Sequence, residues 1–173
     1  MIRISGLCLR LTGFSLKDVT FGVGPGEFFA LMGPTGSGKT LVLESVAGLA
    51  AYQSGSVHVA GQDVSLLPPE RRRVSLVYQD HSLFPHMTVL ENVIYGQRYH
   101  GIPAAEGRAV ALDLLERLGL SRLASRSPAH LSGGEKQRLA LARALACRPD
   151  VVLLDAPLSS LDPQFRDGLR AEL

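Results

Sequence analysis

The sequence lacks the features that would place it in a membrane, in a disulfide-rich fold or on nucleic acid. No apolar run approaches the roughly 18 residues that a membrane-spanning helix needs, and the N-terminus has no signal-peptide pattern. The only cysteines, Cys8 and Cys147, match no metal-binding spacing, so we expect reduced, packed thiols of a cytosolic protein. A formal net charge of +2 disfavours a nucleic-acid binder driven by bulk charge.

The apolar pattern instead predicts one packed α/β domain. Of the 173 residues, 46% are hydrophobic, which is enough for a core. The basic run Arg71-Arg72-Arg73 is expected to be a solvated turn. Short apolar runs are typical of buried parallel strands, and three- and four-residue apolar spacing indicates helices. The predicted strands are Ile2–Leu11, Phe14–Val23, Glu27–Met32, Val74–Tyr78 and Val151–Leu154, with a strand and turn over Gly55–Val64, and the predicted helices are Thr40–Leu49, Val89–Gly119 and Gly133–Ala146.

A glycine-rich loop follows the strand predicted at Glu27–Met32. Gly33–Thr40 (GPTGSGKT) fits G-x-x-x-x-G-K-[ST] and opens a predicted helix, which is the context of a phosphate-binding loop. Glycines let backbone N–H groups turn toward phosphate oxygens, Lys39 offers a charge, and Thr40 offers a hydroxyl to Mg²⁺. The alternative is a plain glycine turn. The predicted phosphate-binding residues are Gly33, Thr35, Gly36, Ser37, Gly38, Lys39 and Thr40.

A carboxylate ends the apolar strand Val151–Leu154. Asp155 at that position is costly unless something uses its charge. Beside a phosphate loop the use is coordination of Mg²⁺, directly or through water, and the alternative is a helix N-cap or a turn.

A third motif begins the predicted helix Gly133–Ala146. Ser132 is a candidate N-cap and Glu135 follows three residues later, as in a capping box. A plain capped helix does not explain Gly133 and Gly134, because glycine is disfavoured inside helices. The two glycines therefore favour close approach of the backbone to an anion.

Five segments in this order resemble the ATP-binding cassette (ABC) ATPases. They are the loop Gly33–Thr40, Gln79 in VYQD, the signature-like Leu131–Arg138 (LSGGEKQR), the strand that ends at Asp155, and the D-loop-like Ser160–Pro163 (SLDP). The resemblance implies ATP and Mg²⁺ as ligands, with Thr40, Gln79 and Asp155 at the Mg²⁺ and Gln79 and Asp155 as catalytic residues.

The resemblance also implies the architecture: a P-loop NTPase (RecA-like) core with an N-terminal antiparallel β-subdomain and an inserted α-helical subdomain. The core would comprise residues 1–87 and 147–173, and the helical signature subdomain residues 88–146. We expect a single nucleotide-binding domain, 1–173, whose C-terminal part is missing.

In the family two cassettes pair head to tail, so the resemblance implies a second nucleotide-binding domain as partner. Ser132, Gly133, Gly134 and Asp162 would contact ATP held by that partner, and Asp80–Asn92 would contact a transmembrane permease subunit. The chain would lie on the cytoplasmic face of the cell membrane, with no nucleic-acid partner. Gly33–Leu49 and Tyr78–Met87 look most like importer ATPases for molybdate, tungstate or sulfate.

The sequence departs from the family pattern first at Ala156, where a glutamate normally polarises the attacking water. Loss of a general base typically costs ~10²–10⁴ in rate, so we expect Mg-ATP binding with weak hydrolysis. Changing Ala156→Glu is not expected to restore full turnover by itself. The reason is that the five histidines all precede Asp155, so none matches the family's switch histidine; they are His58, His81, His86, His100 and His130.

The strand that carries this histidine lies, in the family, between the phosphate-loop strand and the Asp155 strand. Either a neighbouring chain fills the gap or the two strands close up. The adenine-stacking aromatic is also missing from its expected place near Arg10 or Leu11. Phe14, which could equally be a core residue, and the Arg10 guanidinium are the candidates to hold the base.

Three functional hypotheses remain. The first is the ATP-binding subunit of an importer that couples ATP binding and hydrolysis to the transport of a solute, for which an oxyanion is the candidate. The second is a cassette or fragment that binds ATP and does not hydrolyse it, which Ala156 and the lack of a match to the switch histidine favour. The third is a soluble ABC ATPase acting on nucleic acid or ribosomes, which the low net charge and the lack of a coiled-coil insertion disfavour.

Overall fold

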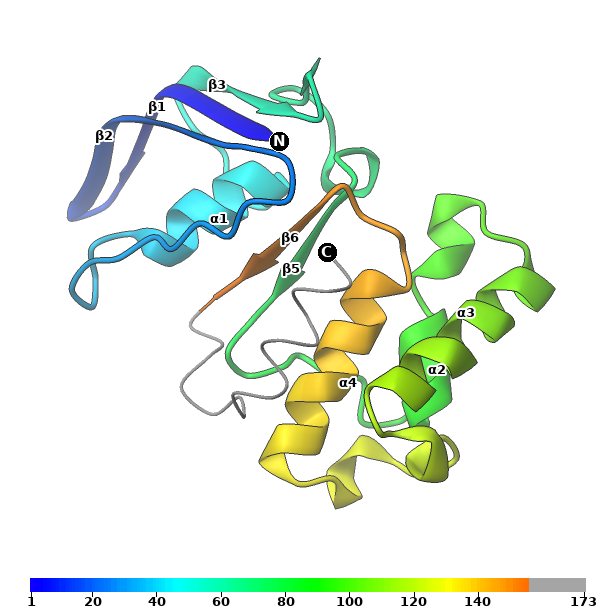
Figure 1. Cartoon of the computed structure of the whole chain (residues 1–173). Coiled ribbons are helices and arrows are strands. Elements are labelled where there is room, and N and C mark those ends of the chain that lie inside the picture. Colours follow the sequence, from blue (N-terminus) through cyan, green and yellow to red (C-terminus); the bar gives the residue numbers. More distant parts are fainter. Residues whose placement is uncertain (156–173) are drawn as a thin grey trace.

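The computed structural model describes residues 1–155, so Ala156, Asp162 and the segment Ser160–Pro163 lie outside the described residues. The chain begins with a four-stranded antiparallel sheet in the order β2-β1-β3-β4 (Figure 1). In β1, apolar side chains alternate with polar ones, and Ile2, Ile4, Leu7 and Leu9 are buried. The strands are β1 (Ile2–Leu11), β2 (Phe14–Val23), β3 (Ser54–Val59) and β4 (Gln62–Asp63).

A second sheet has two parallel strands. β5 (Val74–Val77) pairs in register with β6 (Val151–Leu154), from Val74 opposite Val151 to Val77 opposite Leu154. The helix α1 (Lys39–Ala47) lies between this sheet and the antiparallel one (Figure 1). Val42 and Val46 of α1 share one apolar cluster with residues of β1, β3 and β6, so α1 is held between the two sheets.

The helical part forms its own apolar cluster. It contains α2 (Val89–Ile94), α3 (Ala104–Arg117) and α4 (Gly133–Leu145), whose buried residues include Val93, Leu115 and Leu139. The single helix predicted for Val89–Gly119 is wrong, because the chain is helical there in separate pieces. Between α2 and α3 it forms a 3-10 turn, η2 (Gln97–His100), followed by Gly101 in a left-handed conformation and by Pro103. Further 3-10 turns are η1 (Pro69–Arg71), η3 (Ser121–Leu123) and η4 (Pro128–His130).

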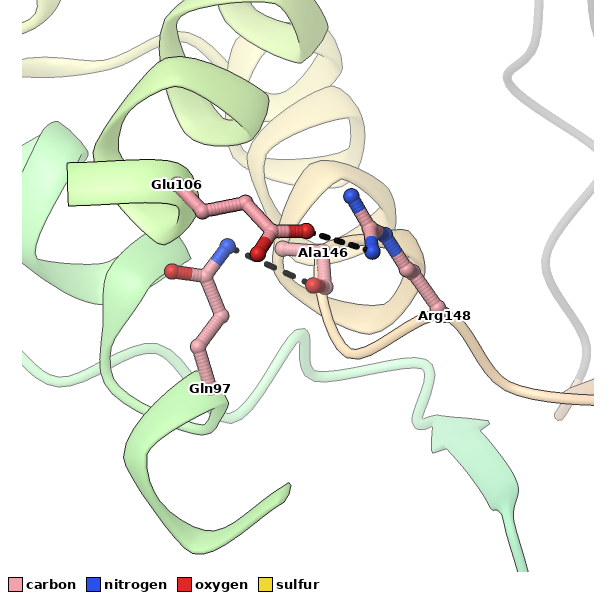
Figure 2. A network of polar contacts seen from close by, with 4 residues as sticks. All are labelled: Gln97, Glu106, Ala146 and Arg148. Atoms are coloured by element: carbon pink, nitrogen blue, oxygen red, sulfur yellow. Dashed lines mark hydrogen bonds and ion pairs between the residues drawn. The ribbon is translucent and has the colours of Figure 1, made fainter. Parts of the chain in front are cut away.

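Polar contacts join η2 and α3 to the end of α4 (Figure 2). The buried Gln97 donates from Nε2 to the carbonyl of Ala146 over 3.3 Å, and Arg148 pairs with Glu106 over 2.7 Å. A Cβ at Gly107 would collide with the Gln97 amide, so a larger residue at that position of α3 would displace the Gln97 side chain from its bond to Ala146. These contacts fix the C-terminal end of α4 against the start of α3.

The segment Glu27–Met32, predicted as a buried parallel strand, is neither a strand nor buried. Phe28 is 51% exposed and Met32 is 88% exposed, while Phe29 stacks on Phe21 of β2 with ring centroids 4.9 Å apart. A parallel strand needs neighbours that supply hydrogen-bond partners, and no described strand pairs with this segment. Within residues 1–155, β6 pairs only with β5, so the alternative in which the two strands close up is wrong.

The basic run Arg71-Arg72-Arg73 is also not the solvated turn that its composition predicts, because Arg72 is only 5% exposed. Its guanidinium donates to the carbonyls of Ser45 and Val46 at the end of α1, over 2.9 and 3.1 Å. Two further bonds reach the carbonyls of Leu67 and Ser65. Arg72 therefore satisfies carbonyls that the end of a helix leaves without partners and ties α1 to the segment before β5.

Replacing Arg72 with methionine, which keeps the hydrocarbon volume and removes every donor, is expected to lower the free energy of unfolding by about 3 kcal/mol or more, because buried carbonyls lose charged donors. Arg73→Met is the matched control. Arg73 is exposed and forms a surface ion pair with Asp150, of a kind worth about 0.2–1 kcal/mol. Urea denaturation of both variants measures the difference, and equal losses would contradict the structural role given to Arg72.

Candidate functional site

The phosphate-loop motif stands at the start of α1. Gly36 and Gly38 have φ of 80° and 91°, in the left-handed region where glycine is favoured, and α1 begins at Lys39 directly after Gly38. Lys39 donates from Nζ to the carbonyls of Gly33 and Pro34, each over 2.9 Å, so its ammonium lies over the loop. Backbone N–H groups at a helix start and one ammonium form an arrangement suited to an anion.

Thr40 and Asp155 meet although 115 residues separate them in the sequence. The Thr40 hydroxyl donates to Asp155 Oδ2 over 2.8 Å. Asp155 reaches this position because its N–H bonds to the carbonyl of Val77, which extends the pairing of β5 and β6 by one residue. A hydroxyl and a carboxylate are hard oxygen donors of the kind that Mg²⁺ prefers, so the pair fits that ion.

Gln79 lies two residues beyond the end of β5, in an exposed turn at the same end of the sheet as Asp155. The preceding residue, Tyr78, anchors this turn by donating from its hydroxyl to Glu44 Oε1 of α1 over 2.9 Å. Partial burial, the bond to Glu44 and nearby carboxylates, Asp155 among them, raise the pKa of Tyr78 to about 12. The tyrosine stays neutral at physiological pH and can keep donating this bond.

Phe14, one candidate to hold adenine, lies next to the phosphate loop. A Cβ built on Gly38 would stand 2.7 Å from Phe14 Cζ and the same distance from Leu16 Cδ2, so the β2 side chains press directly against this glycine. Phe14 is half-buried and also packs on the core cluster of β1 and α1. Arg10, the other candidate, is exposed and its N–H donates to Gln53.

The signature-like motif forms the N-terminus of α4. Ser132 Oγ accepts from the N–H of Glu135 over 3.3 Å, and Glu135 Oε2 accepts from the N–H of Ser132 over 2.7 Å, so the predicted capping box is confirmed. These bonds to Ser132 lower the pKa of the Glu135 carboxyl. The start of α4 is well separated from the start of α1, so this chain does not bring Ser132 to its own phosphate loop (Figure 1).

Neither glycine of this motif is required by the described part of the chain. A Cβ at Gly133 would meet no described atom within 4 Å, and one at Gly134 would meet only Arg138 Nη1, at 3.7 Å. Neither residue has a positive φ. Gly133 and Gly134 are the first two residues of α4, and glycine forms a helix less readily than alanine. Because no contact among the described residues requires glycine at these positions, the two glycines favour a binding partner that approaches the start of α4 closely.

A comparison with models of protein families shows to which family the chain belongs. The family model described as ABC transporter matches residues 16–159 of the chain. The chain belongs to the ABC transporter family. The match includes the phosphate loop, Gln79, the signature motif and Asp155, the four motifs that the structure describes.

Curated members of the ABC family with similar sequences are import ATP-binding proteins. The chain is 44% identical, over all of its length, to the molybdate/tungstate import ATP-binding protein WtpC of Thermococcus kodakarensis, 52% of which is covered. It is 46% identical over 92% of its length to the spermidine/putrescine import ATP-binding protein PotA of Roseobacter denitrificans, of which 44% is covered. The Fe(3+) ions import ATP-binding protein FbpC of Agrobacterium fabrum is 44% identical over the same share, with 45% covered. The chain thus spans about half the length of these relatives.

A solved ABC structure has the same fold. It is the dimeric post-hydrolysis state of the ATP-binding cassette MJ0796 bound to ADP and Pi, which is 31% identical. The TM-score is 0.83, and the match covers 98% of this chain and 79% of the other. The expected P-loop core with an antiparallel β-subdomain and an inserted helical subdomain is therefore confirmed. Among residues 1–155, no helix is both long enough and apolar enough to cross a bilayer.

Sequence patterns did not single out three polar residues of this ABC cassette. Arg143 of α4 bonds to the loop after Gln79, Asn92 of α2 bonds to the same loop, and Glu44 receives the Tyr78 hydroxyl. For Asn92 a signal exists, because it follows the apolar Val89 by three residues, a spacing that places both on the same side of a helix. Nothing distinguishes Arg143 in the sequence from Arg138, the other arginine of α4.

Proposed function

We propose that this chain is the ATP-binding part of an ABC importer subunit, in which binding and hydrolysis of ATP drive transport. The observation that carries the proposal is the hydrogen bond between the Thr40 hydroxyl and the Asp155 carboxylate. It places two oxygens suited to Mg²⁺ at the end of the phosphate loop to which Lys39 also bonds. When bound, Mg²⁺ would neutralise phosphate charge. Thr40, Gln79 and Asp155 would hold the ion, and Gln79 and Asp155 would act in catalysis.

The phosphates would be bound by the loop, in which Gly33, Thr35, Gly36, Ser37 and Gly38 offer a flexible backbone and Lys39 and Thr40 offer side chains. We propose the division into an ATP-binding core, 1–87 with 147–173, and a helical signature subdomain, 88–146. The separate apolar cluster of α2, α3 and α4 supports that division.

A second cassette, paired head to tail, is the partner that we propose. The glycines at the start of α4, which the described contacts do not explain, support it, as does the dimeric state of the solved cassette. Ser132, Gly133, Gly134 and Asp162 would then contact ATP bound to the other copy. Permease subunits would contact Asp80–Asn92, and the subunit would lie on the cytoplasmic face of the membrane.

For the solute we propose an oxyanion of the molybdate type, supported by the relative that matches over the whole chain. Relatives named for polyamine and iron import are about equally similar, so the choice of solute depends on other subunits. The test is uptake of molybdate by a complete transporter that carries this cassette, with uptake of spermidine and Fe³⁺ measured alongside.

Equilibrium binding of ATP, with Mg²⁺ and with EDTA, tests the proposed site. The parent chain is expected to bind more tightly with Mg²⁺, and Asp155→Asn is expected to lose that enhancement, by about tenfold or more, because the amide carries no charge for the ion. Affinity in EDTA should change little. Equal Mg²⁺ dependence in the two proteins would remove Asp155 from the metal site.

Ala156 favours a second function, in which the cassette binds ATP and pairs with a second cassette around it without hydrolysing it rapidly. Alanine at position 156 cannot serve as the base that a glutamate directly after the metal-binding aspartate would provide for the attacking water. Binding without turnover would assign this chain to the second function, and binding with turnover to the first.

A further inference from the structure

The loop after Gln79 has a backbone that these residue types rarely adopt. His81 and Ser82 are consecutive non-glycine residues with φ of 65° and 42°. Such backbone is strained for a residue other than glycine and persists only when its surroundings hold it. Asp80 holds part of this turn, since its Oδ1 accepts from the Ser82 N–H over 3.2 Å and from the Ser82 hydroxyl over 2.7 Å.

Arg143 of α4 holds the other side of the same turn. Its Nη1 donates to the Ser82 carbonyl over 2.7 Å, and its Nη2 donates to the His81 carbonyl over 3.1 Å. The guanidinium also lies over the ring of Phe84, 5.2 Å from its centroid. The planar guanidinium of Arg143 therefore bonds to both strained residues at once. These bonds form where the chain between β5 and α2 passes beside α4 (Figure 1).

The rest of the loop is fixed to α2. Asn92, 0% exposed, accepts from the Phe84 N–H and donates to the carbonyls of Phe84 and Thr88. The residue before Gln79 is fixed instead to α1, through the bond from Tyr78 to Glu44. Gln79 thus stands between an anchor on the phosphate-loop helix and an anchor on the helical part.

We propose that Arg143 is a positioning residue for Gln79: by holding the carbonyls of His81 and Ser82, it transmits the position of α4 to Gln79, which lies in the turn after β5 at the same end of the sheet as Asp155. The inference rests on the proposed function, because Gln79 matters there only if Mg-ATP binds. Lysine cannot replace the arginine, since a single ammonium lacks the two-pronged planar geometry that engages both carbonyls and stacks on Phe84.

The first measurement is the affinity for Mg-ATP, and for ATP in EDTA, of the parent, Arg143→Ala, Gln79→Ala and the double variant. Each single variant is expected to weaken Mg-ATP binding by about tenfold, the lower end of the loss seen when outer-shell support of a metal site is removed. Affinity in EDTA stays unchanged. The double variant is expected to be no weaker than Gln79→Ala, because Arg143 acts through that residue.

The second measurement is amide hydrogen exchange without nucleotide. In Arg143→Ala the Ser82 amide is expected to exchange faster, while the amides of α1 keep their protection. Arg143→Lys, a milder change, is expected to reproduce the loss of Mg-ATP affinity and carries the test if the alanine variant unfolds. Arg122→Ala, at an exposed position of η3, is the matched control and should behave as the parent does.

The positioning role would be overturned if the double variant lost Mg-ATP affinity by the product of the two single losses. Parent-like Mg-ATP affinity in both Arg143 variants would also overturn it. These outcomes presuppose a parent that binds Mg-ATP. A parent chain that binds none would overturn the proposed function itself and this inference with it, so the parent's own affinity distinguishes the two failures.

Discussion

Replacing Lys39 with alanine is expected to abolish measurable binding of ATP. The ammonium lies at the start of α1, 2.9 Å from two carbonyls of the phosphate loop, where it can exchange those carbonyls for phosphate oxygens. Each hydrogen bond to a charged group contributes about 1.5–3 kcal/mol. Loss of two such bonds weakens binding by about 10²–10⁴-fold, at about 1.4 kcal/mol for each factor of ten. Titration with a fluorescent ATP analogue measures the change.

Lys17→Ala is the control for this experiment, because Lys17 is an exposed lysine of β2 and successive side chains of a strand point to opposite faces, so it does not share the face of Phe14 and Leu16 that packs on Gly38. It removes the same charge and should bind ATP as the parent does. The bonds made by Lys39 are themselves exposed, so Lys39→Ala is expected to unfold at nearly the parent temperature. Parent-like ATP affinity in folded Lys39→Ala would show that the phosphate loop has been assigned wrongly.

The second large effect is expected at Ala156, the residue that follows Asp155. The parent chain should bind Mg-ATP and hydrolyse it slowly, and Ala156→Glu should raise the rate by a measurable part, but not the whole, of the ~10²–10⁴-fold that a positioned general base contributes. Affinity for Mg-ATP should stay the same, since Lys39, Thr40 and Asp155 are unchanged. Release of phosphate, followed at several protein concentrations, measures turnover and its dependence on pairing of two chains.

Ala156→Gln separates the base from the size of the side chain. Glutamine has nearly the shape of glutamate and cannot accept a proton, so this variant should bind Mg-ATP and turn over no faster than the parent. Equal rates for the glutamate and glutamine variants would contradict the assignment of the general base to this position. A parent chain with fast turnover would contradict the second function proposed above.

The parts of the fold that follow from short-range pattern could be predicted from the sequence. Alternating apolar residues gave β1 and β2, and the capping box gave the start of α4, because both depend on neighbouring residues alone. The contact of Thr40 with Asp155 could be anticipated from the motifs, since the phosphate loop and the acid that ends Val151–Leu154 are both assigned to one Mg²⁺.

The remaining features depend on what lies beside a residue in space. Glu27–Met32 has the composition of a buried strand, but a strand forms only beside a hydrogen-bonding partner. Arg72 belongs to a basic run and is buried, because the end of α1 presents carbonyls to it. The contacts of Arg143 depend on the packing of α4 against the loop that follows β5. These contacts join segments that are far apart in the sequence, so a pattern of neighbouring residues does not predict them.

The buried position of Arg72 also has an electrostatic consequence for the opposite end of α1. A helix carries a partial negative charge at its C-terminus, which partly cancels the attraction of its N-terminus for anions. Arg72 bonds to the carbonyls of Ser45 and Val46, so its full positive charge offsets that negative end. The nine residues of α1 span ~13 Å, a distance at which a unit charge is worth roughly 1 kcal/mol at an effective dielectric constant near 20. Arg72 therefore makes the whole of α1 a source of positive potential toward the phosphate loop, without touching what binds there.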